Sequence, residues 1–135
     1  MAVVGSRDFP RPNLVRNFIY TLTQGDVVVS GGARGVDRLA ETVALSRGMK
    51  VRVIKPDVVG IPAYGEEGYK QAYSARAKER NQKIVDDSDQ VVAFWDGVSP
   101  GTRDTIARAR LAGKMVTVVY PDGKKETVAG VGCGG

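Results

Sequence analysis

The stretch Val27-Val28-Val29-Ser30-Gly31-Gly32-Ala33-Arg34-Gly35-Val36-Asp37 decides the fold of this chain. Three consecutive valines predict a buried strand, and the glycines after them predict a tight turn. A helix is expected next, because apolar residues recur at positions 36, 39, 40, 43 and 44. A strand, a glycine turn and an amphipathic helix in this order indicate a parallel βαβ unit.

The same turn has the form of a phosphate-binding loop. Glycines let the backbone come close to an anion, and the first N–H groups of the helix point toward it with the positive end of the helix dipole. Ser30 stands where a dinucleotide-binding loop has its first glycine, and no Lys-Ser/Thr pair completes a P-loop. A tight turn without a ligand is the alternative interpretation.

Apolar runs and helical patterns alternate along the whole chain, which predicts an α/β three-layer sandwich. We expect a mainly parallel five-stranded sheet with a short antiparallel edge hairpin, in a single domain over residues 1–129, followed by a flexible glycine-rich tail at 130–135. The expected strands cover 2–5, 27–30, 51–54, 90–95, 115–120 and, at the edge, 125–128; helices are expected at 12–24, 36–48, 74–86 and from 102 to 112, with a long loop at 55–73.

Composition excludes several kinds of chemistry. The chain has no histidine, which excludes Ser-His triads, a histidine general base and histidine-ligated metals. The single cysteine, Cys133, allows neither a disulfide framework nor a cysteine-ligated zinc site. We therefore expect no metal and no cofactor, and a reducing, cytoplasmic location.

The charge balance favours an anionic partner. The net charge is +5 and the pI is about 9.5, with lysines and arginines scattered along the chain. This distribution suits a phosphorylated small molecule, and it also allows nucleic acid. The apolar run at residues 2–4 is too short for a signal peptide or a membrane span, so no membrane association is expected.

Three turns follow expected strands, at the edge where open parallel sheets bind ligands. Glycine N–H groups, hydroxyls and guanidinium groups in these turns are the donors that bind phosphate and ribose. The candidate ligand-binding residues are Gly5, Ser6, Arg7, Ser30, Gly31, Gly32, Ala33, Arg34, Gly35, Asp37, Gly97, Ser99, Gly101 and Thr102 in these turns, together with Asn81. For Asp37 and Thr102, capping of a helix is the alternative.

Arg80 and Asn81 stand out because they fall on the apolar face of the helix before the fourth strand. An unpaired buried guanidinium is costly, so Arg80 should meet a carboxylate, carbonyl groups or a ligand phosphate. Extension into solvent or a structural ion pair with Asp96 are the alternatives. The tyrosines at 64, 69 and 73 could stack on a nucleobase, and their loop could close over the site.

Four motifs taken in order resemble the SLOG superfamily, in particular its small stand-alone YspA-like branch. They are Gly5-Ser6-Arg7-Asp8-Phe9, residues 30–37, Arg80-Asn81, and residues 93–97 with Gly101-Thr102. The resemblance reaches about Val119 and implies a Rossmann-like sheet with a pocket for a nucleotide or nucleotide-derived ligand. Its relatives include LOG-type phosphoribohydrolases, which cleave the N-glycosidic bond of nucleoside monophosphates, and DNA-processing protein A, which binds single-stranded DNA.

The resemblance also implies site residues. The catalytic arginine of LOG enzymes corresponds to Arg80, and their phosphate-binding glycine and threonine correspond to Gly101 and Thr102. Their catalytic glutamate has Thr105 in its place, so a hydrolase reaction would need Asp96 or Asp104 beside Arg80.

The sequence thus predicts a domain that binds a nucleotide-type ligand, as a sensor or as a weak N-glycosidic-bond hydrolase. A single-stranded nucleic-acid-binding module of the DNA-processing protein A type is the alternative. A homodimer or higher homo-oligomer is expected in either case.

Overall fold

A six-stranded sheet forms the centre of the computed structural model, which describes residues 1–130. The strands are β1 (Ala2–Gly5), β2 (Val27–Ser30), β3 (Lys50–Val53), β4 (Gln90–Phe94), β5 (Met115–Val119) and β6 (Lys125–Val128). They lie in the order β3-β2-β1-β4-β5-β6, and β6 alone runs antiparallel to its neighbour. The predicted parallel sheet with an antiparallel edge is confirmed. Residues 131–135, which hold Cys133 and most of the predicted tail, lie outside the described part.

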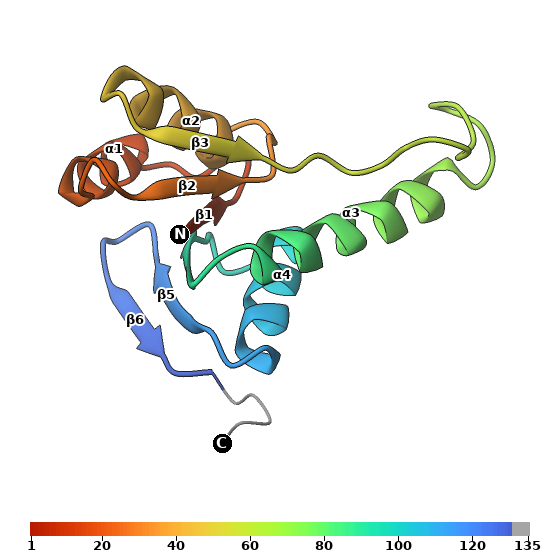
Figure 1. The fold of residues 1–135 in the computed structure, drawn as a ribbon. Coiled ribbons are helices and arrows are strands. Elements are labelled where there is room, and N and C mark those ends of the chain that lie inside the picture. Colours follow the sequence, from red (N-terminus) through yellow and green to blue (C-terminus); the bar gives the residue numbers. More distant parts are fainter. Residues whose placement is uncertain (131–135) are drawn as a thin grey trace.

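Two helices cover each face of the sheet (Figure 1). α1 (Pro12–Thr21) and α2 (Val36–Ser46) pack on one face, against Val3, Val28 and Phe94. α3 (Tyr69–Asp86) and α4 (Pro100–Leu111) belong to the other face, where Ile84, Val85 and Ala109 meet the alternate residues of the strands. Burial on both faces explains why the strands read as continuous valine-rich runs.

Helix α1 ends three residues earlier than predicted. Leu22 has an extended backbone, with φ −77° and ψ 151°, and the Asp26 carboxylate accepts a hydrogen bond from the Thr23 N–H at 2.9 Å. The apolar period continues into Leu22, which is buried, but the backbone has already left the helix.

Helix α3 starts five residues earlier than predicted. Gly68 precedes it with φ +84° and ψ −8°, a left-handed conformation that glycine adopts without steric cost. Beyond Gly68 no glycine or proline interrupts the 18 helical residues. The sequence pattern predicts a loop through the three tyrosines, yet Tyr69 and Tyr73 belong to the first turns of this helix.

The first part of α3 extends away from the sheet and carries the 54–68 loop at its far end (Figure 1). The rings of Tyr64 and Tyr69 meet edge to face at 5.3 Å, and those of Tyr69 and Tyr73 lie 5.7 Å apart. Tyr64 is 88% exposed. We call residues 55–78 the arm. No helix within residues 1–130, α3 included, has the length and apolar character needed to cross a membrane.

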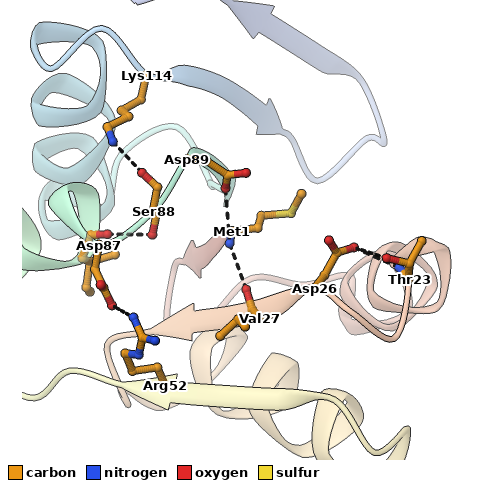
Figure 2. A network of polar contacts seen from close by, with 10 residues as sticks. Met1, Thr23, Asp26, Val27, Arg52, Asp87, Ser88, Asp89 and Lys114 are labelled. Atoms are coloured by element: carbon orange, nitrogen blue, oxygen red, sulfur yellow. Dashed lines mark hydrogen bonds and ion pairs between the residues drawn. The ribbon is translucent and has the colours of Figure 1, made fainter.

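Polar contacts join neighbouring segments at the amino ends of the strands (Figure 2). The Met1 ammonium donates to the Val27 carbonyl at 2.9 Å, and Arg52 of β3 pairs with Asp87 after α3. Lys114 donates to the Ser88 carbonyl at 2.6 Å. The first contact joins β1 to β2, and the other two join β3 and β5 to the segment between α3 and β4; a cavity of about 370 Å³ lies at this end of the sheet.

Candidate functional site

A cavity of about 470 Å³ lies at the carboxyl ends of the strands. The chain runs outward in one direction from β1 through β2 to β3 and in the other from β4 to β5, so the strand order reverses between β1 and β4. This switch point is where open α/β sheets bind ligands. The cavity is lined by Val4, Gly5, Ser6, Arg7, Ala33, Asp37, Arg80, Asn81, Ile84, Ser99, Pro100, Gly101, Thr102 and Thr105.

Arg80 brings a half-buried positive charge into this cavity. Its Nη1 donates to the Gly31 carbonyl at 2.7 Å, and its Nε donates to the Asn81 Oδ1 at 3.0 Å. Within residues 1–130 it forms no ion pair, with Asp96 or any other carboxylate. Two neutral acceptors therefore fix the side chain, and its charge acts on the nearby carboxyl group of Asp37 without a direct ion pair in the described part of the chain.

Asn81 connects Arg80 to the start of α4. Its side chain is buried, and its Nδ2 donates to the Asp104 Oδ2 at 3.0 Å and to the Gly101 carbonyl at 3.5 Å. Asp104 is held in turn by Arg108, whose Nε lies 2.8 Å from the same oxygen. This chain of contacts sets where the guanidinium of Arg80 lies relative to the first turn of α4.

Backbone N–H groups of the glycine-rich turn donate hydrogen bonds to side chains of the protein itself. The Gly31 N–H donates to the Asp37 Oδ2 at 3.0 Å, and the Gly32 N–H donates to the Ser30 Oγ at 3.1 Å. The Ser30 hydroxyl donates to Glu41 on α2. Gly31, Gly32 and Ser30 do not line the cavity, although their loop supports the wall that Ala33 and Asp37 form.

Gly35 is required for packing between two loops. It caps α2 with φ +83°, and an added Cβ would lie 2.1 Å from the Arg7 carbonyl oxygen. Gly5 makes a similar close approach, because a Cβ there would lie 2.6 Å from the Phe94 carbonyl oxygen. Contact of the backbone with other protein segments is sufficient reason for glycine at both positions.

The first turn of α4 offers backbone donors to the cavity. Its first N–H groups have no acceptor within the helix, as in any helix. An added Cβ on Gly101 would meet nothing within 4 Å, so this turn faces open space. Thr102 is buried and lines the cavity beside Gly101. The positive end of the α4 dipole therefore points where Arg80 also lies.

Asp96 shapes the turn before α4. Its Oδ1 accepts hydrogen bonds from the N–H groups of Val98 at 2.9 Å and Ser99 at 2.8 Å, and its Oδ2 accepts the Ser99 hydroxyl at 2.8 Å. Burial acts to raise the pKa of Asp96, but these hydrogen bonds outweigh it and lower the pKa to about 2. The carboxylate is therefore ionised, and both of its oxygens accept hydrogen bonds from residues of the same turn.

The structure does not place all predicted site residues in the cavity. The two candidate catalytic aspartates lie in its surroundings: Asp96 holds the β4–α4 turn, and Asp104 contacts Asn81 and Arg108. Predicted ligand-binding residues outside the lining are Ser30, Gly31, Gly32, Arg34, Gly35 and Gly97. The motifs supply the loops, but only part of each loop reaches the cavity.

Thr105 is a lining residue that was not among the candidate ligand-binding residues. It is buried, and its hydroxyl donates to the Gly101 carbonyl at 3.3 Å. The comparison with LOG enzymes pointed to this position as that of their glutamate. No acidic residue of α4 lines the cavity, and among the residues that do line it Asp37 is the only acid.

Asp37 has an unusual environment for a carboxyl group. It is 5% exposed, and burial raises its pKa to about 6. Backbone hydrogen bonds from Ala33 and Gly31 and the charge of Arg80 oppose this increase, whereas Glu41 adds to it. Within residues 1–130 no group of three or more acidic or cysteine side chains lies close enough to bind a metal ion.

Comparison with known proteins shows the fold and the family of the chain. Residues 1–119 match the family model of the DNA recombination-mediator protein A. The DNA processing protein A of Streptococcus pneumoniae has a similar structure, with a TM-score of 0.66 and 20% identity over 87% of this chain, which spans 50% of that protein. A structural genomics target named TM1055 gives a TM-score of 0.57 and 24% identity over 85% of this chain and 71% of its own.

Comparison with curated protein sequences gives no match. At these identities the two structures establish a shared Rossmann-like fold, and the family model covers most of the chain. The chain is thus a member of the SLOG superfamily and belongs to the DNA recombination-mediator protein A family.

Proposed function

We propose that the cavity at the β1–β4 switch point binds a nucleotide or a nucleotide-derived ligand. The observation that carries this proposal is Arg80, a half-buried guanidinium in the cavity wall with no carboxylate partner among residues 1–130. The ligand phosphate lies between Arg80 and the first turn of α4, at Gly101 and Thr102. Ser6, Arg7 and Ser99 surround the remainder of the ligand.

The domain acts as a sensor of this ligand, and hydrolysis of the N-glycosidic bond is absent or slow. Asp96 and Asp104 already accept hydrogen bonds from neighbouring residues, and Thr105 supplies no carboxylate. Loss of a general acid or base lowers rates by about 10²- to 10⁴-fold. Binding needs only the guanidinium, the helix N-terminus and the hydroxyls.

Calorimetric titration with adenosine monophosphate tests the binding site. A charge-assisted hydrogen bond contributes about 1.5–3 kcal/mol, so Arg80→Ala should weaken binding by about 10- to 150-fold. Arg16→Ala is the matched control, because Arg16 is exposed on α1, on the opposite face of the sheet. Equal affinity of folded Arg80→Ala and Arg16→Ala proteins would contradict the proposal.

Single-stranded nucleic acid is the second candidate ligand, and membership of this family favours it. The net charge of +5 is compatible with binding of a polyanion. Neutralisation of several phosphates would make the affinity fall steeply with salt, with a log–log slope of about −0.7 per phosphate contact. Fluorescence anisotropy with a labelled oligonucleotide at two salt concentrations separates this mode from binding of a mononucleotide, which depends less on salt.

We also propose that the chain self-associates through the arm. The arm has exposed apolar side chains at Val59 (79%) and Tyr64 (88%). Glu66 and Glu67 lie nine to twelve residues before Arg76, which also pairs with Asp57, and Lys78, so two antiparallel arms would place opposite charges together. Sedimentation should show a dimer that Tyr64→Ser weakens and that Tyr20→Ser on α1 leaves unchanged; a monomer at all concentrations would contradict this.

A further inference from the structure

Asp37 and Arg80 hold the same glycine, Gly31, through its two backbone polar groups. Asp37 accepts the Gly31 N–H, and Arg80 donates to the Gly31 carbonyl. An added Cβ on Gly31 would lie 2.9 Å from both the Asp37 Oδ2 and the Arg80 Nη1. The carboxyl group and the guanidinium are therefore close neighbours in one wall of the cavity, although no direct ion pair joins them within residues 1–130.

The other charged groups around Asp37 come from two elements. Glu41 lies one turn later on α2 and accepts a hydrogen bond from the Ser30 hydroxyl. Arg7 lines the cavity from the loop after β1. The α4 side contributes Ser99, Gly101, Thr102 and Thr105, none of which is charged. An anion in the cavity would thus meet two cations, Arg7 and Arg80, and one acid of the wall, Asp37.

An anion and an ionised Asp37 are in conflict. Both would interact with the charge of Arg80, and an anion close to the buried Asp37 carboxylate would be repelled by it. A neutral Asp37 removes this repulsion and can still accept the Gly31 N–H.

This inference rests on the proposed function and adds a rule for it. We propose that Asp37 must be protonated for an anion to bind in the cavity, so that each anion bound retains or takes up one proton at Asp37. Asp37 lies in the first turn of α2, directly after the glycine-rich loop. Its protonation thereby controls whether an anion binds at the neighbouring site.

The expected effect follows from the position of the Asp37 titration. With a pKa of about 6, roughly 3% of Asp37 is neutral at pH 7.5 and roughly 75% at pH 5.5. Apparent affinity for an anion that binds only the neutral form should therefore rise by about 25-fold between pH 7.5 and pH 5.5. Glu41 raises the pKa of Asp37, so its removal should shift the midpoint to lower pH and keep the dependence.

Sulfate is the suitable probe, because its own charge does not change between pH 5 and 8. We would titrate the full chain with sulfate by NMR or calorimetry at pH 5.5 and 7.5, for the unmodified protein, Asp37→Asn and Glu41→Gln. The side-chain amide of the Asp37→Asn variant can still accept the Gly31 N–H but carries no charge. Asp37→Asn should bind sulfate equally at both pH values and, at pH 7.5, about 30-fold more tightly than the unmodified protein.

Three results would overturn the inference: sulfate affinity independent of pH in the unmodified protein, weaker binding by folded Asp37→Asn at pH 7.5, or no sulfate binding at either pH. Titration with adenosine monophosphate then separates this failure from failure of the proposed function. Nucleotide binding that depends on Arg80 would leave the proposed function standing, whereas absence of both kinds of binding would overturn both.

Discussion

Replacement of Gly35 by alanine tests whether the glycine-rich turn is built for contact between two loops. Gly35 has φ +83° and ψ −124°, a region that is essentially restricted to glycine, and a residue with a side chain there costs about 1–3 kcal/mol. An added Cβ would also lie 2.1 Å from the Arg7 carbonyl oxygen and 2.7 Å from its carbon. Both atoms are backbone atoms, so relief requires movement of a whole loop, and such overpacking costs about 1–3 kcal/mol.

A smaller term opposes these costs. Alanine reduces the conformational freedom of the unfolded chain, which stabilises the folded protein by about 0.4–1 kcal/mol. The net loss for Gly35→Ala should therefore be about 2–5 kcal/mol, measured as the free energy of unfolding in urea by circular dichroism. In a domain of this size the midpoint of thermal unfolding should fall by about 3 °C for each kcal/mol.

Gly68→Ala is the control for this experiment. Gly68 also caps a helix, with φ +84°, but its ψ is −8° and an added Cβ would make an ordinary contact at 3.6 Å with Pro62. A single residue in the left-handed region costs about 1–2 kcal/mol, and the unfolded-state term offsets part of it. The reasoning is refuted if Gly35→Ala destabilises the protein no more than Gly68→Ala does.

Four further predictions concern the cavity and its supports. Thr105→Glu should give a modest gain in release of free base from adenosine monophosphate, measured by chromatography, while robust release by the unmodified protein would show that another group supplies the carboxylate. Asn81→Ala should lower the free energy of unfolding by about 1–3 kcal/mol, because it removes the hydrogen bonds that the buried Asn81 side chain makes with Arg80 and Asp104; an unchanged urea midpoint would contradict this. The lowered pKa of Asp96 means that its contribution to stability is present above about pH 4 and is lost as the pH falls toward about 2, so the thermal midpoints of Asp96→Ala and the unmodified protein should converge over that interval. The raised pKa of Asp37 has the opposite sign: ionisation of Asp37 costs stability as the pH rises from about 4 to about 6, so Asp37→Asn should gain relative stability in thermal scans at pH 8 compared with pH 4.5.

Local sequence patterns are sufficient to predict the layers of this protein. The valine runs at 27–29 and the apolar periods of 36–44 are local patterns, and the structure places β2 and α2 where these patterns predict them. The spacing of apolar residues along the sequence indicates which side chains are buried, because alternate strand residues and every third or fourth helix residue face the core. The ends of helices and strands are harder to predict from such patterns. The start of α3, for example, depends on a single left-handed glycine at position 68.

The tertiary structure alone decided which polar groups face the cavity. Asp96 and Asp104 look equally suitable in the sequence, yet one is held by the Ser99 hydroxyl and N–H and the other by Arg108. The glycine-rich turn looks like an anion cradle, yet Asp37 takes the Gly31 N–H. A motif records residue types and spacing, whereas hydrogen-bond partners come from segments far apart in the chain, such as Gly31 and Arg80, which only the folded sheet brings together.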